Sequence, residues 1–228
     1  MGPPATNIAA VHELKPGIWH WQAPHPEWTQ ESAWPREVSS YAVDDGRRLL
    51  LFDPLAVPDE ILQLAEQRET TIVLTAPWHE RDTERLVERL GVPVFTPPPD
   101  TQQDLMRKYD LTAEQAGDGS PDLRWLLAGG GESHLYAAGE RLPLGIEAFP
   151  GREHNDLVLW VEHVRAVVAG DTLVDFGSGF RIADWLREAV TREQVAEGLR
   201  PLLALPVELV LPAHGAPTDR AALERALS

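Results

Sequence analysis

Short apolar runs rich in valine and leucine recur along the whole sequence, and they constrain the fold more than any other feature. Runs of this length without strict alternation are typical of strands that are buried on both faces. Segments with turn signals or helical periodicity separate the runs, so the sequence predicts a mixed α/β protein. The segments that contain the runs are 47–54, 70–77, 92–97, 156–162, 165–171 and 207–213.

The expected elements follow one plan in both halves of the chain. Each half starts with strands joined by tight turns, such as the hairpin signal Asp44-Asp45-Gly46, and continues with alternating helices and strands. This plan suits two mixed sheets packed face to face with helices outside, a four-layer αββα sandwich. The length fits one such domain, 1–228, and no shift in composition marks a boundary.

The stretch between the two halves has a different character. Residues 101–117 have a helical pattern with Leu105, Met106 and Tyr109 on one side. Residues 116–131 are rich in Gly, Asp, Ser and Pro and indicate a loop. We expect this loop to line or cover a site.

Composition excludes several classes of function. The chain has no cysteine, which rules out disulfides, thiolate ligands and a cysteine nucleophile, so a metal site would need His, Asp or Glu. The net charge of −16, from 36 acidic and 20 basic residues, repels nucleic acid and anionic lipid. We therefore expect a small-molecule ligand or substrate, and the sequence leaves the oligomeric state open.

The sequence also bears on where the protein works. The stretch 1–14 lacks a basic segment followed by an apolar run, and no run of about 18 apolar residues occurs anywhere. This pattern favours neither export nor a membrane span. A cytoplasmic protein is the simplest expectation.

Five segments together carry a family resemblance. In order they read LLLFDP, IVLT followed by a histidine-containing loop, FPG, VVAGDTLVD and LVLPAHG. Their order and spacing resemble the metallo-β-lactamase superfamily over nearly the whole chain. The resemblance implies the αββα fold and a hydrolase whose one or two zinc or iron ions generate hydroxide.

The first metal motif of that family is degraded in this sequence. Members usually carry HxHxDH after the IVLT strand. After Thr75 its two leading histidines fall on Ala76 and Trp78, its aspartate on Glu80 and its last histidine on Arg81. Three of these four side chains cannot bind a metal.

Of the family's later metal-ligand positions, two still carry a side chain that can bind a metal. The ligand histidine of the family's GHTPGH loop falls on Arg152, whereas Asp171 in GDTL and His214 in AHG stand where the family has ligands. We expect Asp171 and His214 to lie in one pocket. Asp53 stands where the family often has an aspartate that supports the ligands, and it could equally cap a strand end.

One hypothesis is a rearranged metal site in a hydrolase acting on a small ester, lactone, thioester or amide. His79, His154, Asp171 and His214 would hold one divalent ion, Zn, Fe or Mn. Glu80 or Asp82 would orient or deprotonate the attacking water, and His214 completes the expected catalytic set. A variant of this hypothesis dispenses with the metal and uses His79 or His214 as general base beside an aspartate.

The rival hypothesis is a metal-free, non-catalytic descendant. Carboxylates kept in a pocket without a metal need positive charge, and Arg81 and Arg152 occupy two former ligand positions. They would bind a small anion such as a carboxylate. We favour the metal-free state, because fixed guanidinium groups disfavour a neighbouring metal ion.

Aromatic residues near the start of the chain suggest a cover for the pocket. Trp19 and Trp21 alternate as on one face of a strand, which predicts simple packing. The family uses the loop of its first hairpin to cover substrate, so the resemblance implies that His25 and Trp28 lie in a loop that overhangs the site. With Trp78, Arg81 and Arg152 they form the expected ligand-binding set.

Overall fold

A computed structural model describes residues 10–187 and 190–228. Its first sheet combines an antiparallel meander with parallel strands, in the order β1-β2-β3-β4-β5-β6-β7. The Asp44-Asp45-Gly46 turn joins β3 to β4, as predicted. The strands are β1 His12–Lys15, β2 Ile18–Pro24, β3 Glu37–Asp44, β4 Arg48–Phe52, β5 Glu69–Val73, β6 Val94–Thr96 and β7 Ser133–Leu135.

The second sheet has the order β14-β11-β10-β9-β8, in which β11 and β14 are parallel. A short ribbon of β12 and β13 adjoins it. The strands are β8 Arg141–Leu142, β9 Ile146–Glu153, β10 Asp156–Val161, β11 Ala166–Gly170, β12 Leu173–Val174, β13 Arg181–Ile182 and β14 Leu209–Pro212.

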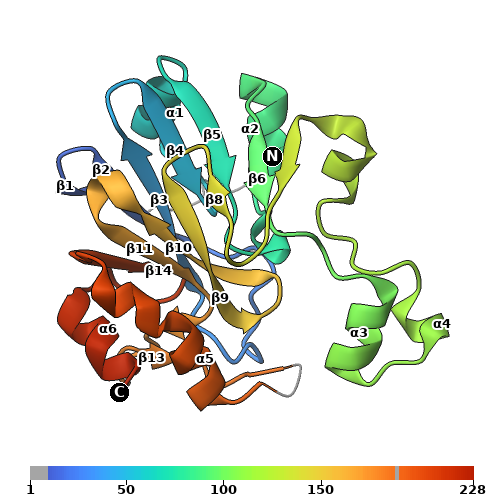
Figure 1. Ribbon diagram of the computed structural model, residues 1–228. Helices are drawn as coiled ribbons and strands as arrows, with labels where there is room; N and C mark the ends of the chain where they lie inside the picture. The colour runs from blue at the N-terminus through green and yellow to red at the C-terminus, as the bar shows by residue number, and fades with distance from the viewer. Residues whose placement is uncertain (1–9, 188–189) are drawn as a thin grey trace.

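Apolar side chains fill the space between the sheets and beneath the helices. Phe52 and Leu157 belong to the central cluster, which both sheets build. Helices α1 (Asp59–Ala65) and α2 (Thr83–Leu90) cover the outer face of the first sheet, and α5 (Arg192–Leu199) and α6 (Arg220–Ala226) cover the second (Figure 1). The predicted αββα sandwich is confirmed. No helix within the described residues is long and apolar enough to cross a membrane.

The helix predicted over 101–117 is broken in two. Helix α3 spans Gln102–Tyr109 and α4 spans Ala113–Ala116, and both lie to one side of the sandwich (Figure 1). Asp110 ends α3 in the left-handed region, with φ 53°. The side chain of Thr112 then starts α4 with its own capping box. Contrary to the expected apolar face, Tyr109 is 47% exposed and Lys108 is buried.

The loop at 116–131 packs into the sandwich through two leucines. Leu123 and Leu126 are fully buried in the apolar layer between the first sheet and its helices. The segment ends in a helical turn, η2 Leu126–Gly130. The loop therefore anchors the α3–α4 arm to the sandwich.

Candidate functional site

The candidate site lies where the carboxyl ends of four strands meet. Asp53 and Thr75 follow the parallel strands β4 and β5, and Asp171 and His214 follow the parallel strands β11 and β14. The two sheets are joined at this end, because the Leu157 amide donates to the Thr75 carbonyl at 2.9 Å. Parallel strand ends of both sheets thus deliver polar side chains to one place.

Asp171 is the centre of the site. Its Oδ2 accepts hydrogen bonds from Trp78 Nε1 at 3.1 Å and from Arg152 Nη2 at 3.3 Å. Its Oδ1 lies 3.3 Å from His79 Nε2 and 3.4 Å from His214 Nε2. Burial opposes the charge of this carboxylate, but the two imidazoles hold its pKa well below the usual value. Asp171 is therefore ionised at neutral pH.

His79 carries a positive charge between two carboxylates. Its Nδ1 lies 2.9 Å from Thr75 Oγ1 and 3.1 Å from Asp53 Oδ2, opposite the contact with Asp171. Burial alone would lower the pKa of His79, but Asp53 and Asp171 outweigh it and raise the pKa to about 9. Asp53 in turn accepts from the amide and hydroxyl of Thr75, so it holds His79 in place.

All three guanidinium nitrogens of Arg152 contact carboxylates inside the protein. Nε lies 2.7 Å from Asp156 Oδ2 as an ion pair, although its N–H is not aligned for a hydrogen bond. Nη1 pairs with Glu153, and Nη2 donates to Asp171. The residue is only 4% exposed, and the carboxylates raise the pKa of its guanidinium despite burial. These contacts leave Arg152 as an internal cation and do not support its expected role as receptor for an external anion.

Arg81 also points inward. Its Nη1 donates to the carbonyls of Asp53 at 2.6 Å and Ser39 at 3.0 Å, which ties β3 to the end of β4. Its Nε is buried without a hydrogen-bond partner. The backbone adopts φ 42°, a left-handed conformation that costs free energy in a residue with a Cβ. Neither arginine on which the metal-free hypothesis depends faces solvent.

Partly exposed aromatic rings surround this polar centre. The Trp34 ring lies 5.3 Å from that of His214, and Phe176 approaches the same histidine at 5.4 Å. Trp185 stacks on Phe176, and His25 meets the edge of Trp34. Burial, helped by nearby Arg81, His79 and His214, lowers the pKa of His25 to about 4, so its ring is neutral.

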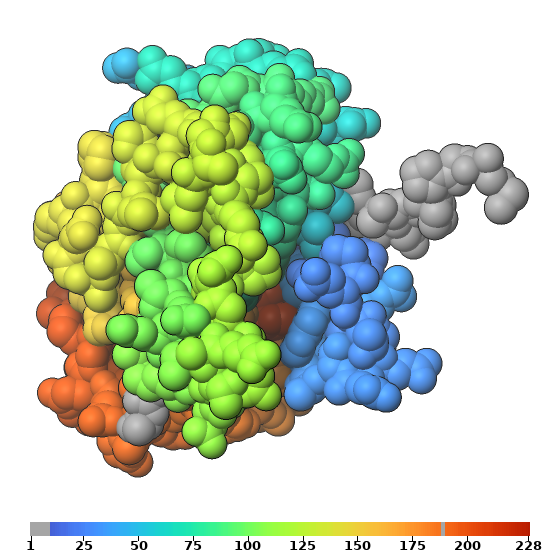
Figure 2. All heavy atoms as spheres, turned by 90° about the vertical axis from the view of Figure 1, so that its right-hand side faces the viewer, coloured from blue at the N-terminus to red at the C-terminus, as the bar shows by residue number. Residues whose placement is uncertain are grey.

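Figure 2 shows an opening on one face of the molecule. A hollow separates the blue N-terminal loop from the green arm, and atoms of the C-terminal part of the chain lie at its floor. Trp34, Phe176 and Trp185 were not selected from the sequence. Their positions could have indicated a functional role, because all three lie in connections between strands, where binding residues are common.

The architecture matches solved structures closely. The metallo-β-lactamase DIM-1 superposes with a TM-score of 0.62 over 97% of this chain and 96% of that chain, at 12% identity. TMB-1 gives 0.60 over 96% and 94%, also at 12% identity. The chain has the metallo-β-lactamase fold. A metallo-β-lactamase from Erythrobacter litoralis gives 0.60 over 95% and 93% at 14% identity. No protein-family model and no curated protein matches the sequence.

Within this metallo-β-lactamase fold, His154 lies apart from the site, which corrects its expected place beside Asp171. Its Nε2 is 3.9 Å from carboxylate oxygens of Asp100 and Asp104, next to α3. The reason is local geometry: Arg152, the last residue but one of β9, faces the site, and the chain turns into β10 after Glu153. His154 at that turn faces the arm.

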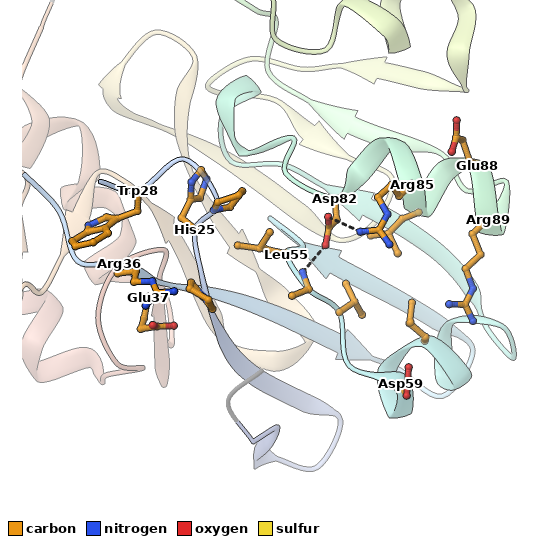
Figure 3. Close-up of a pocket in the computed structure, with 16 residues that line it drawn as sticks. His25, Trp28, Arg36, Glu37, Leu55, Asp59, Asp82, Arg85, Glu88 and Arg89 are labelled. Atoms are coloured by element: carbon orange, nitrogen blue, oxygen red, sulfur yellow. Dashed lines mark hydrogen bonds and ion pairs between the residues drawn. The ribbon is translucent and has the colours of Figure 1, made fainter. Parts of the chain in front are cut away.

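Glu80 and Asp82 also turn away from the strand ends and do not join the expected catalytic set around Asp171. Glu80 accepts a hydrogen bond from the Leu123 amide of the anchoring loop. Asp82 accepts from the Ala56 amide at 2.6 Å and lies near Arg85 (Figure 3). The start of α2 directs both side chains toward neighbouring backbone.

Two of the expected cover residues border a groove beside α1 and α2. His25 and Trp28 lie on its rim, together with side chains from α1 and α2 (Figure 3). Trp28 donates from Nε1 to the Trp34 carbonyl at 2.8 Å. Trp28 therefore supports the Trp34 loop, while His25 borders both groove and cleft.

The residues at the site do not fit the metal ions that this fold implies. A tetrahedral zinc with bonds of about 2.1 Å places its ligand atoms about 3.4 Å apart. Asp171 meets this distance with each imidazole, but His79, Asp171 and His214 do not bring three ligand atoms within 4.8 Å of one another. A buried guanidinium already touches Asp171.

A second cluster comes closer to metal geometry but already holds a cation. Among the described residues, Asp100, Asp104 and His154 alone bring ligand atoms within 4.8 Å. The Lys108 ammonium lies 2.7 Å from Asp100 Oδ1. Thr101 donates to Asp104 as part of the cap of α3. This cluster is explained as the docking point of the arm.

Proposed function

We propose that this protein binds a small molecule at the Asp171 centre without a metal ion, using a fold in which Arg152 supplies the internal positive charge. The observation that carries the proposal is the contact of the buried Arg152 guanidinium with Asp171, Asp156 and Glu153. A divalent ion beside this fixed charge would be repelled in a medium of low dielectric. The site keeps the carboxylate and replaces the cation.

The protonation states favour binding over hydrolysis. A general base must be unprotonated at the working pH, but His79 has a pKa of about 9 and is protonated. Arg152 and Arg81 remain charged. The carboxylates of Glu80 and Asp82 accept hydrogen bonds from the Leu123 and Ala56 amides, and no contact joins either of them to Asp171 among the hydrogen bonds and ion pairs of the described residues.

One observation favours a second candidate, metal-free hydrolysis of a small ester, lactone, thioester or amide. His214 Nε2 lies 3.4 Å from Asp171 Oδ1, and its Nδ1 is buried without a hydrogen-bond partner. An aspartate that orients one imidazole nitrogen and leaves the other free is the arrangement of a general base. In this candidate His214 Nδ1 takes the proton of the attacking water.

Elemental analysis and a binding screen test both candidates. We expect less than ~0.1 equivalent of Zn, Fe or Mn per chain after growth with added metal, and a melting temperature that EDTA does not change. A screen of small organic molecules should contain compounds that raise the melting temperature. One equivalent of metal, lost together with stability in EDTA, would overturn the proposal. Chelator-resistant ester hydrolysis that disappears in His214→Gln would replace it with the second candidate.

A further inference from the structure

The arm beside the cleft is joined to the body of the protein by a narrow neck. It comprises residues 100–120, contains α3 and α4, and projects from one side of the sandwich (Figure 1). At the neck the Ser120 amide donates to the Asp100 carbonyl at 2.8 Å. Gly119 adopts φ 94° there, and a Cβ at this position would lie 2.6 Å from the same carbonyl oxygen. The two legs of the arm therefore touch, so rotation at one place moves the whole arm.

Polar contacts, rather than apolar packing, hold the arm against the body. Among the described residues, no side chain of 100–120 belongs to the apolar clusters of the sandwich. Leu123 and Leu126, just beyond the neck, do belong to one of these clusters. Burial of apolar surface is the dominant stabilising contribution in a fold, so a segment that lacks it detaches at a low cost in free energy.

A buried lysine fastens the arm to the body. The Lys108 ammonium on α3 lies 2.6 Å from Glu153 Oε2, at the end of β9, and donates to Asn155 Oδ1 at 2.9 Å, in the turn before β10. It also lies 2.7 Å from Asp100 Oδ1 at the neck. We call Lys108 together with Asp100, Glu153 and Asn155 the latch.

The latch favours the docked arm only weakly, because its charges lose their hydration when it forms. The Lys108 side chain has no exposed surface. Desolvation of buried ions offsets most of their mutual attraction. When the arm leaves, water reaches the ammonium and the carboxylates, and this hydration compensates for the lost ion pairs. Two states that differ by a small free energy are what a movable segment requires.

The docked arm forms one wall of the cleft. In Figure 2 the green arm faces the blue N-terminal loop across the hollow. Beside the latch, the Arg187 guanidinium lies 4.5 Å from the centroid of the Tyr109 ring. Tyr109 is 47% exposed, so this contact breaks without uncovering a core. The position of the arm therefore sets the width of the opening.

The latch also reaches the Asp171 centre. Glu153 pairs with both Lys108 and Arg152. The Trp78 ring centroid lies 5.6 Å from the Lys108 ammonium and 5.4 Å from the Arg152 guanidinium, and Trp78 Nε1 donates to Asp171 Oδ2 at 3.1 Å. Departure of the arm would take one of the two cations away from Glu153 and from Trp78.

We propose that the arm is a gate on the cleft, which the Lys108 latch holds closed. In the closed state the arm narrows the opening to the Asp171 centre. In the open state the latch is hydrated and the cleft is wide. This inference goes beyond the proposed binding function, and its test needs no ligand.

Spin labels on both walls of the cleft measure the opening. The chain has no cysteine, so Gln30→Cys in the N-terminal loop and Glu114→Cys in α4 direct the labels to two exposed positions. Pulsed electron-spin resonance on the doubly labelled full chain should give one main distance, with at most about a tenth of the molecules at a longer one. Adding Lys108→Met should increase this longer-distance population about fivefold or more, because Asp100 and Glu153 then need water in place of the ammonium.

Two further variants separate the latch from a general effect of charge or folding. Arg107→Met is the matched control: Arg107 is the neighbouring, exposed cation of α3 and pairs with Asp104 of the same helix, so the distances should stay unchanged. Tyr109→Ala removes an exposed ring and keeps Lys108, so it should increase the longer-distance population, but less than Lys108→Met. Circular dichroism checks that each variant folds, and Tyr109→Ala decides if Lys108→Met does not.

The results are independent of the metal content. Unchanged distances in both Lys108→Met and Tyr109→Ala would overturn the gate, and so would an equal shift in Arg107→Met. Stoichiometric metal in the purified protein would instead overturn the proposed function and leave the gate intact.

Discussion

Two buried cations organise neighbouring parts of this protein in different ways. Arg152 contacts Asp171, Asp156 and Glu153 at the strand ends, whereas Lys108 reaches from the arm to Asp100 and Glu153. Glu153 lies between them, and both cations flank Trp78.

The difference between the two cations lies in what each of them holds. The planar guanidinium, with three nitrogens, joins carboxylates from three places in the second sheet. The ammonium is a point charge that docks one segment onto another. The comparison teaches that one internal cation gathers the carboxylates of a single sheet, while a second one attaches the arm beside it.

Replacing these cations with a neutral side chain should change the free energy of unfolding more than any other substitution considered below. Arg152→Met leaves three buried carboxylates without their cation and should lower the free energy of unfolding by about 3–5 kcal/mol. Lys108→Met should lower the free energy of unfolding by less, because detachment of the arm would let water reach the carboxylates of Asp100 and Glu153. Urea denaturation measures both. Equal losses of unfolding free energy in the two variants would show that Arg152 and Lys108 stabilise the protein to the same extent, against this prediction.

Conversion to a metal ligand sharpens the comparison. Arg152→His removes the guanidinium from Asp171 and places an imidazole beside it, so we expect it to bind about one zinc per chain. Zinc at about 100 times its Kd should then stabilise the variant by about 2.7 kcal/mol. Lys108→His is the control and should gain no zinc at Asp171. If Arg152→His stays metal-free, the lost front histidines, rather than the arginine, exclude the ion.

The pH dependence of stability tests the charge of the centre. His79 has a folded-state pKa of about 9, above its usual value of 6.5, so its stabilising contribution is complete below pH 6.5 and is lost as pH rises toward 9. The pKa of Asp156 is also raised, to about 7, so its effect has the same sign. Stability falls as pH rises through the lower window between about 4 and 7. Melting temperatures should therefore fall between pH 7 and 9, and His79→Gln should flatten that fall. An unchanged slope in the variant would exclude His79 as its source.

The smallest change in unfolding free energy is expected at the cluster of Asp100, Asp104 and His154 beside the arm. His154 is partly exposed and lies 3.9 Å from its carboxylate neighbours, so His154→Ala should change the free energy of unfolding by less than about 1 kcal/mol. Metal content should not change either. A loss of bound metal in this variant would restore the rearranged metal site that the structure does not assemble.

The amino-acid sequence by itself determined the layers of the fold. Local periodicity records which strands are buried and which helices are amphipathic, so the αββα sandwich was predictable. The order of motifs also placed Asp171 and His214 at the ends of parallel strands, and it placed arginines at 81 and 152. These are properties of short segments and of their order.

Only the tertiary structure decided which side chains meet. Glu80, Asp82 and His154 lie within a few residues of the site in sequence, yet turns and helix starts direct them elsewhere. Lys108 and Trp185 are distant in sequence and reach the centre through long-range packing. Side-chain direction at a turn depends on backbone angles and on distant partners, and a linear pattern records neither.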